Sequence, residues 1–232
     1  MVFSAKILKI FQMRNCFAEL VHFFALRSKN QIVMSKVKFY PWIGKNWGVS
    51  FGGKLILVLG ESHYCASPAD AYPGMTWDII KDLFDPNSPH EPYKNTYTKF
   101  AKALSGKFDR MTIADKEELW ESVAFYNYIQ EPLTGPRIAP SDAQFKASEE
   151  AFEEVVDTWQ PDVIIAWGHR LYSHLPGWGY QGRNVQGPDG TQFETWVYPL
   201  PDGRCAHVLG IDHPSVGFTP EYWHFVIKQL IE

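Results

Sequence analysis

Cysteine is scarce in this sequence: Cys16, Cys65 and Cys205 are the only three in 232 residues. Cysteines this few and this far apart exclude a disulfide framework, a zinc ribbon and a four-thiolate iron–sulfur site. His63 and Cys65 form one pair of metal-ligand types, but no second pair accompanies them. We therefore expect neither a metal nor a cofactor, and a reducing, cytoplasmic compartment.

The chain also lacks an excess of basic residues and a long apolar run. It has 22 basic and 26 acidic side chains and a formal net charge of −4, so no overall positive field attracts nucleic acid. Any contact with DNA must come from a local patch. We expect no membrane span, because no apolar stretch reaches the roughly 20 residues that a bilayer requires.

The first 33 residues differ from the rest, with five basic residues and one acidic residue. Their apolar positions are interrupted by Arg14, Glu19 and His22, and no A-x-A-like site marks a signal peptide. One interpretation is a helix for a membrane surface or a partner. We favour another, in which Met34 is the natural start and residues 34–232 form a single, monomeric domain.

What the sequence has in abundance is apolar and aromatic residues, at 45% and 16%. Residues 54–60 are an unbroken aliphatic run ending in glycine, which is typical of a strand buried on both faces. Similar runs at residues 123–127, 162–168 and 205–211 alternate with helical patterns at 76–84, 93–104, 116–121, 141–159 and after Thr219. The alternation predicts an α/β fold with a parallel sheet and helices on both faces.

The carboxyl-terminal half also contains a predicted loop and a predicted hairpin. Residues 176–192 are rich in glycine, which favours a long loop of the kind that is often functional. Residues 193–200, a turn at 201–203 and residues 205–211 predict a hairpin whose second arm joins the sheet.

Polar side chains follow each predicted parallel strand. They are Glu61 to Tyr64, then Asn127, then His169 with Arg170, and last His213 with Ser215. The carboxyl ends of parallel strands meet at one edge of a sheet, so we expect these residues to lie together. A carboxylate, an amide and an imidazole at one edge suit a reaction that activates water and stabilises an anionic leaving group.

These motifs resemble the uracil-DNA glycosylase superfamily across residues 39–232. The resemblance lies in Gly60-Glu-Ser-His-Tyr64 after the first strand, Asn127 after the second, and His213-Pro-Ser215 after the last. It implies a three-layer α/β/α fold with a central, mainly parallel four-stranded sheet. It also implies a monofunctional glycosylase that flips a nucleotide out of DNA and hydrolyses its glycosidic bond.

The resemblance assigns roles to the central residues. Glu61 would stabilise the oxocarbenium-like sugar and orient water, as in the thermophile-type branch, whose iron–sulfur cluster these cysteines cannot supply. Ser62 stands where the best-known branch has its acid and is a lesser candidate. Asn127 would hydrogen-bond the base edge, with a strand-end turn as the alternative. His213 would donate to a base carbonyl oxygen.

Further residues are expected to contact the base or the DNA. Tyr64 matches the position that excludes a 5-methyl group, His63 stands beside it, and Tyr72 or Trp77 would stack on the base or else belong to the core. Val216 and Phe218 would wedge into the vacated stack, or else staple the last helix. Arg137, His169, Arg170 and Ser215 are the remaining DNA-binding candidates.

The expected substrate is uracil or a modified pyrimidine, including bulky cytosine modifications of the kind found in phage DNA. A competing interpretation is a hydrolase with Ser62 as nucleophile and His213 as base, although Tyr64 stands where the nucleophile elbow needs glycine. A third is an inactive nucleic-acid-binding module that kept only the fold.

Overall fold

The structure is a computed structural model that describes residues 34–135, 138–215 and 217–232. The expected extension at residues 1–33, Arg137 and Val216 lie outside the described residues. Residues Lys36–Glu232 form one compact unit, and this unit contains every other candidate residue.

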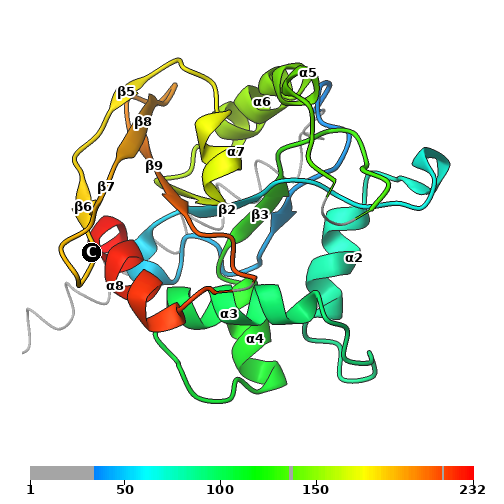
Figure 1. The fold of residues 1–232 in the computed structure, drawn as a ribbon, viewed down its shortest axis with the longest axis horizontal. Coiled ribbons are helices and arrows are strands. Elements are labelled where there is room, and N and C mark those ends of the chain that lie inside the picture. Colours follow the sequence, from blue (N-terminus) through cyan, green and yellow to red (C-terminus); the bar gives the residue numbers. More distant parts are fainter. Residues whose placement is uncertain (1–33, 136–137, 216) are drawn as a thin grey trace, which may run out of the picture. The chain divides into compact units, whose positions relative to one another are not determined.

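A seven-stranded, mainly parallel sheet forms the centre of this unit (Figure 1). In order across the sheet, the strands are β1 (Trp42–Ile43), β3 (Ala124–Asn127), β2 (Ile56–Gly60), β4 (Val163–Trp167), β9 (Cys205–Ile211), β8 (Thr195–Pro199) and β5 (Tyr180–Gln181). Strands β3, β2, β4 and β9 pair in parallel, whereas β1, β8 and β5 are antiparallel to their neighbours. The mixed α/β class is therefore confirmed, but a sheet of four strands was too small.

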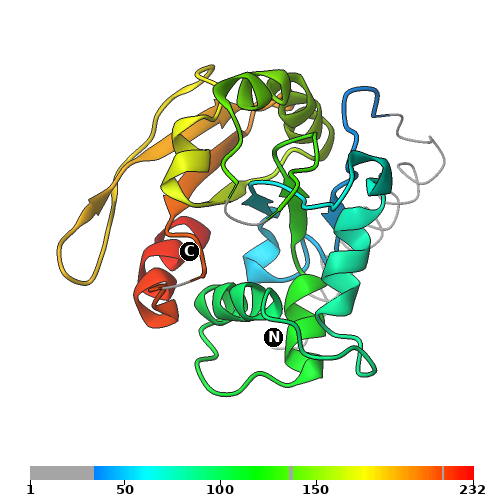
Figure 2. The ribbon, with the colours of Figure 1, turned by 45° about the vertical axis from the view of Figure 1, so that its right-hand side comes forward.

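Helices lie on both sides of the sheet in the two ribbon views (Figure 2). On one side are α2 (Met75–Asp82), α3 (Lys94–Ser105), α4 (Ile113–Trp120) and α8 (Pro220–Ile231), and on the other are α5 (Asp142–Ala147), α6 (Glu149–Trp159) and α7 (His169–Ser173). Over the described residues, no helix is long and apolar enough to cross a membrane. The predicted helices at 76–84, 93–104 and 116–121 and the helix after Thr219 are confirmed, with ends shifted by a few residues.

Strands β2, β3 and β4 bury both of their faces, which explains their unbroken apolar sequences. All five residues of β2 and of β4 are buried. Val58 and Ile165 belong to the core that Phe100 of α3 and Trp223 of α8 complete. On the opposite side, Phe152 of α6 packs against other aromatic rings of the core. A strand with no wet face has no reason to alternate apolar with polar residues.

The single helix expected over residues 141–159 is two helices, α5 and α6, divided at Ser148. The Ser148 hydroxyl donates to the Gln144 carbonyl (2.8 Å) and accepts the Gln130 backbone N–H (3.1 Å). A buried backbone N–H needs a partner, and a serine inside a helix can supply one at the cost of helix regularity. The expected N-cap is confirmed, since the Ser141 hydroxyl accepts the Gln144 N–H.

The glycine-rich segment at residues 176–192 is more regular than a loop. It contains β5, which extends the main sheet, and β6 (Val185–Gln186), which forms a separate two-stranded ribbon with β7 (Gln192–Phe193). The predicted hairpin is confirmed, because β8 and β9 pair over five residues.

Lys94, at the start of α3, is bonded to Asp82 at the end of α2. It is a charged residue, yet it is only 5% exposed. Its ammonium donates to the Asp82 carbonyl (2.9 Å) and the Ser88 hydroxyl (2.7 Å), and it pairs with the Asp82 carboxylate (2.9 Å). Burial raises the pKa of Asp82, but hydrogen bonds from Ser88, Tyr93 and Lys94 outweigh burial, so the pKa lies below its usual value. The Lys94 ammonium therefore ties together the two ends of the loop between α2 and α3 through its hydrogen bonds.

We expect Lys94→Met to lower the free energy of unfolding by about 3 kcal/mol, because the Asp82 carboxylate would lose its counter-charge in a partly buried place. Urea titration measures the change. Lys146→Met is the matched control: the Lys146 side chain, which pairs with Glu149 across the break at Ser148, is 77% exposed, so its loss should cost under about 0.5 kcal/mol. Equal effects of the two substitutions would contradict the assignment.

Candidate functional site at the carboxyl edge of the sheet

The segment after β2 runs beside the segment after β3. Four backbone hydrogen bonds join them: Tyr128 N to Gly60 O, Ile129 N to Glu61 O, Leu133 N to His63 O and Cys65 N to Leu133 O, all between 2.8 and 3.0 Å. We call residues 60–65 and 127–133 the paired segments. These bonds satisfy backbone groups of both segments and fix the backbone that carries Glu61 and His63.

Glu61 forms a two-pronged ion pair with Arg170, which lies in α7 just after β4. Arg170 Nε donates to one carboxylate oxygen at 2.8 Å and Nη2 to the other at 2.5 Å. The Glu61 side chain is 12% exposed and that of Arg170 is 51% exposed. Hydrogen bonding to Glu61 raises the pKa of Arg170 above its usual value. A nearly enclosed carboxylate at the sheet edge is thus held by a half-exposed cation.

His213 follows β9 and lies within electrostatic reach of both members of this pair. Burial lowers the pKa of His213, Glu61 opposes this shift and Arg170 adds to it. Its Nδ1 lies 3.0 Å from the Ser215 hydroxyl, and its ring meets the buried Trp167 ring with centroids 6.2 Å apart. With Nδ1 engaged by Ser215, Nε2 is the ring nitrogen left for a ligand. A neutral imidazole can donate there if its proton sits on Nε2.

Asn127 and His63 form a buried pair behind Glu61. The Asn127 amide nitrogen lies 3.1 Å from His63 Nε2 and 3.3 Å from Nδ1, and the Thr76 hydroxyl lies 3.0 Å from Nε2. His63 is 1% exposed and Asn127 is 4% exposed. Burial lowers the pKa of His63 from 6.5 to about 4. The ring is therefore neutral at pH 7 and keeps a lone pair that accepts an Asn127 N–H.

The phenol Tyr64 is exposed, and it interacts electrostatically with Arg170. Tyr72 and Trp77 are also exposed, so the interpretation of these two rings as core residues is wrong. The Tyr72 hydroxyl donates to Asp78, and Trp77 Nε1 donates to the Pro41 carbonyl at 2.9 Å. Among the described contacts, neither ring touches Glu61, Asn127 or His213.

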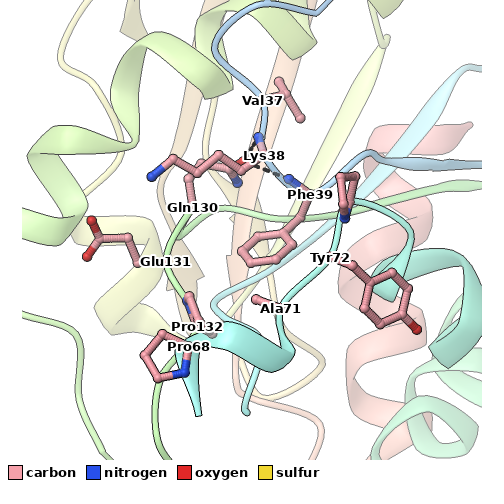
Figure 3. A pocket seen from close by; sticks show the side chains of 10 residues that line it. Val37, Lys38, Phe39, Pro68, Ala71, Tyr72, Gln130, Glu131 and Pro132 are labelled. Atoms are coloured by element: carbon pink, nitrogen blue, oxygen red, sulfur yellow. Dashed lines mark hydrogen bonds between the residues drawn. The ribbon is translucent and has the colours of Figure 1, made fainter.

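A pocket of about 550 Å³ lies between the segment at residues 37–39 and the segment at residues 130–132 (Figure 3). Its wall includes the Phe39 ring, which meets the His63 ring edge-on with centroids 4.8 Å apart. The Gln130 side chain in its lining accepts the N–H groups of Lys38 and Phe39, as the dashed lines show. The other lining residues are Val37, Pro68, Ala71, Tyr72, Pro73, Glu131 and Pro132. Glu61, Asn127 and His213 do not line it.

Two further expectations are corrected. Phe218 is 5% exposed and stacks on Trp223 of α8, with ring planes 8° apart, so it staples the last helix and is not free to enter a base stack.

The Ser62 hydroxyl is buried and has no hydrogen-bond partner in the described structure, while His213 is bonded to Ser215. The Ser62–His213 dyad that a serine hydrolase requires is therefore not formed.

The other two DNA-binding candidates are placed at the same edge. His169 Nε2 lies 2.9 Å from the Asp212 carboxylate, and both side chains are exposed. The Ser215 carbonyl accepts from Lys99 of α3. In the part of the chain that the structure describes, no group of three His, Cys, Asp or Glu side chains has the arrangement of a metal site.

No family model and no curated protein matches this chain. The resemblance of its motifs therefore remains a prediction, and the meaning of the site depends on its geometry.

The structure brings together Glu61, Arg170 and His213, and it places Asn127 with His63 beside them. Sequence reasoning assigned Arg170 to phosphate and did not foresee its pairing with Glu61. It also missed Thr76 of α2, whose hydroxyl contacts His63, and Lys99 of α3, which donates to the Ser215 carbonyl. No motif marks either residue. Only the fold, which packs these two helices under the sheet edge, identifies them.

Gly60 leaves room for the Asn127 amide. A Cβ at position 60 would lie 2.3 Å from Asn127 Oδ1 and 2.9 Å from the Phe125 ring. We expect Gly60→Ala to lower the free energy of unfolding by about 1–3 kcal/mol, because the amide must leave His63 or the strand must shift. Gly177→Ala is the control, since a Cβ there meets no atom within 4 Å. A Gly60→Ala protein as stable as this control would contradict the packing.

Stability should fall in acid through His63. Its pKa is lowered on folding, so the unfolded chain binds a proton first, and stability decreases as pH falls from about 6.5 to about 4. Between about pH 7 and about pH 4.5, wild type should lose about 2 kcal/mol more than His63→Gln. Urea titrations at the two pH values measure this. The exposed His90, changed to Gln, should leave the wild-type loss unaltered.

Proposed function

We propose that this chain is a monofunctional DNA glycosylase that removes uracil or a modified pyrimidine from DNA and leaves an abasic site. The supporting observation is that an enclosed carboxylate, Glu61, and an imidazole with one nitrogen available, His213, share one edge of a parallel sheet. In this proposal the four parallel strands and the helices beside them correspond to the three-layer, four-stranded core of the uracil-DNA glycosylase superfamily. The protein works in the cytoplasm as a monomer.

The reaction divides between these two residues. Water attacks the sugar carbon C1′ as the glycosidic bond breaks. The electron pair of that bond passes to the base, and the proton that the water loses neutralises the departing base anion. Glu61 stabilises the positive charge that develops on the sugar and orients the water. His213 donates from Nε2 to a base carbonyl oxygen, where negative charge grows. Both partners are groups of this chain, so the reaction requires no cofactor.

Asn127 would recognise the polar edge of the flipped base. With its proton on Nε2, His63 accepts an amide N–H of Asn127 at Nδ1 and donates from Nε2 to the Thr76 hydroxyl. An amide whose orientation is fixed presents its donor and its acceptor in a set order, which favours one arrangement of groups on a pyrimidine edge. Tyr64, exposed beside Arg170, is placed to border the entrance.

DNA contact would come from basic side chains at the same edge, because the chain as a whole is acidic. Arg170 is half exposed, and His169 lies beside it at the start of α7. Arginine binds phosphate through two parallel N–H bonds, so this edge offers the local positive charge that the composition lacks. The segment containing Ser215 lies next to them after β9.

The test is incubation of wild type with oligonucleotides that carry uracil, 5-hydroxymethylcytosine or its glucosylated form, followed by alkaline cleavage at abasic sites. We expect cleavage with at least one base. Glu61→Gln should reduce the rate by about a hundredfold or more, because a neutral amide cannot stabilise the sugar cation, while oligonucleotide binding remains.

Glu118→Gln is the control, since Glu118 is exposed and forms a surface ion pair with Lys107. Absence of abasic sites with every base would contradict the proposal, and binding without cleavage would favour an inactive nucleic-acid-binding module. Full cleavage by Glu61→Gln would show that Glu61 has no part in the reaction.

A further inference from the structure

The ion pair at Glu61 conflicts with the work that the proposed reaction assigns to this residue. Arg170 occupies both oxygens of the carboxylate. A cation in that position neutralises the charge that should stabilise the sugar, and it takes the oxygens that should orient water. Catalysis would benefit from a carboxylate that keeps its charge and has at least one oxygen available.

The exposure of the two side chains indicates which of them moves. Glu61 is 12% exposed and its backbone carbonyl is bonded to Ile129, so it is fixed within the paired segments. Arg170 is 51% exposed and comes from α7, which has only five residues. The guanidinium can therefore leave while the carboxylate stays, but its departure uncovers a charge in a nearly enclosed place, a cost that a new partner for the guanidinium must offset.

A DNA phosphate is a fitting second partner for this guanidinium. Carboxylate and phosphate both accept two parallel N–H bonds from arginine, so one side chain can pass from one to the other without losing its hydrogen bonds. His213, the imidazole next to it, does not compete for the guanidinium, because burial drives this ring toward its neutral form.

We propose that Arg170 is a latch that binds Glu61 in the free protein and transfers to a backbone phosphate next to the flipped nucleotide, so that DNA binding releases the carboxylate. The latch rests on the proposed glycosylase function and adds regulation by the substrate to it. Glu61 then loses its counter-charge only when a sugar is in place. Arg170 is a positioning residue here, since it acts through Glu61.

The first test is the salt dependence of binding to a single-stranded oligonucleotide, which does not depend on catalysis. Arg170→Gln should reduce the slope of log K against log salt by about 0.7, the value of one phosphate contact on a single strand. Arg170→Lys keeps the charge and should keep most of the slope. An unchanged slope in Arg170→Gln would overturn the latch.

The second test replaces single phosphates around the target nucleotide by neutral methylphosphonates and measures single-turnover rates at saturating DNA. At one position, wild type should slow by about tenfold, because Arg170 then stays on Glu61. Arg170→Gln should be slowed by less than about twofold by the same replacement, since it has no latch to release.

Arg204→Gln is the matched control. Arg204 forms a similar two-pronged set of bonds to Asp202 and Asp162, but at the amino ends of β4 and β9, on the opposite edge of the sheet. It should behave as wild type in both tests. Suppose that wild type forms abasic sites and that the methylphosphonate slows Arg170→Gln as much as it slows wild type. The latch is then wrong, while the glycosylase proposal stands. If wild type forms none, the glycosylase proposal and the latch are both wrong, whatever the salt slope.

Discussion

Strand β2 pairs in parallel with β3 on one side and with β4 on the other, and this pairing decides where the candidate residues lie. Gly60 is level with Asn127 in the register, and Trp167 is level with Ile211. The four parallel strands therefore end at one edge of the sheet, and the residues that follow them lie side by side. Were the register of β2 shifted by one residue, its side chains and Glu61 after them would move to the opposite face, while Asn127 at the end of β3 would stay in place.

The same edge combines three degrees of access to water. His63 and Asn127 are enclosed, Glu61 is almost enclosed, and Arg170 is half exposed. Burial drives the imidazoles of His63 and His213 toward their neutral forms, so Glu61 and Arg170 are the charged members of this group. A small number of charges in a partly dry place interact strongly, because little water screens them. The chemistry of the site therefore depends on where one guanidinium lies.

The sequence was sufficient for the parallel core. Strands buried on both faces leave long apolar runs, and such runs at 54–60 and 162–168 located β2 and β4 closely. It was not sufficient for the borders, because β1 and β5 have two residues each and no periodicity can show in so short a strand. It also missed the break at Ser148, since a serine within a helical pattern is common and its bond to Gln130 depends on the tertiary fold.

The candidate site was predictable to the level of the sheet edge and no further. Strand ends placed Glu61, Arg170 and His213 together, because parallel topology requires it. The pairing of Glu61 with Arg170 joins residues 109 positions apart, and nothing in either local pattern specifies it. Phe218 shows the same limit: an aromatic residue before a terminal helix can face DNA or the core, and only the position of Trp223 decides.

The shortness of the two outer strands has a consequence for self-association. In the described sheet, the borders are β1 and β5, and each offers a ladder of just two residues. An incoming strand from another copy would find few open amide and carbonyl groups in line, too few to prolong the sheet across molecules. The short length of β1 and β5 thereby discourages aggregation by sheet extension at both borders, although neither strand contains a protective charge or proline.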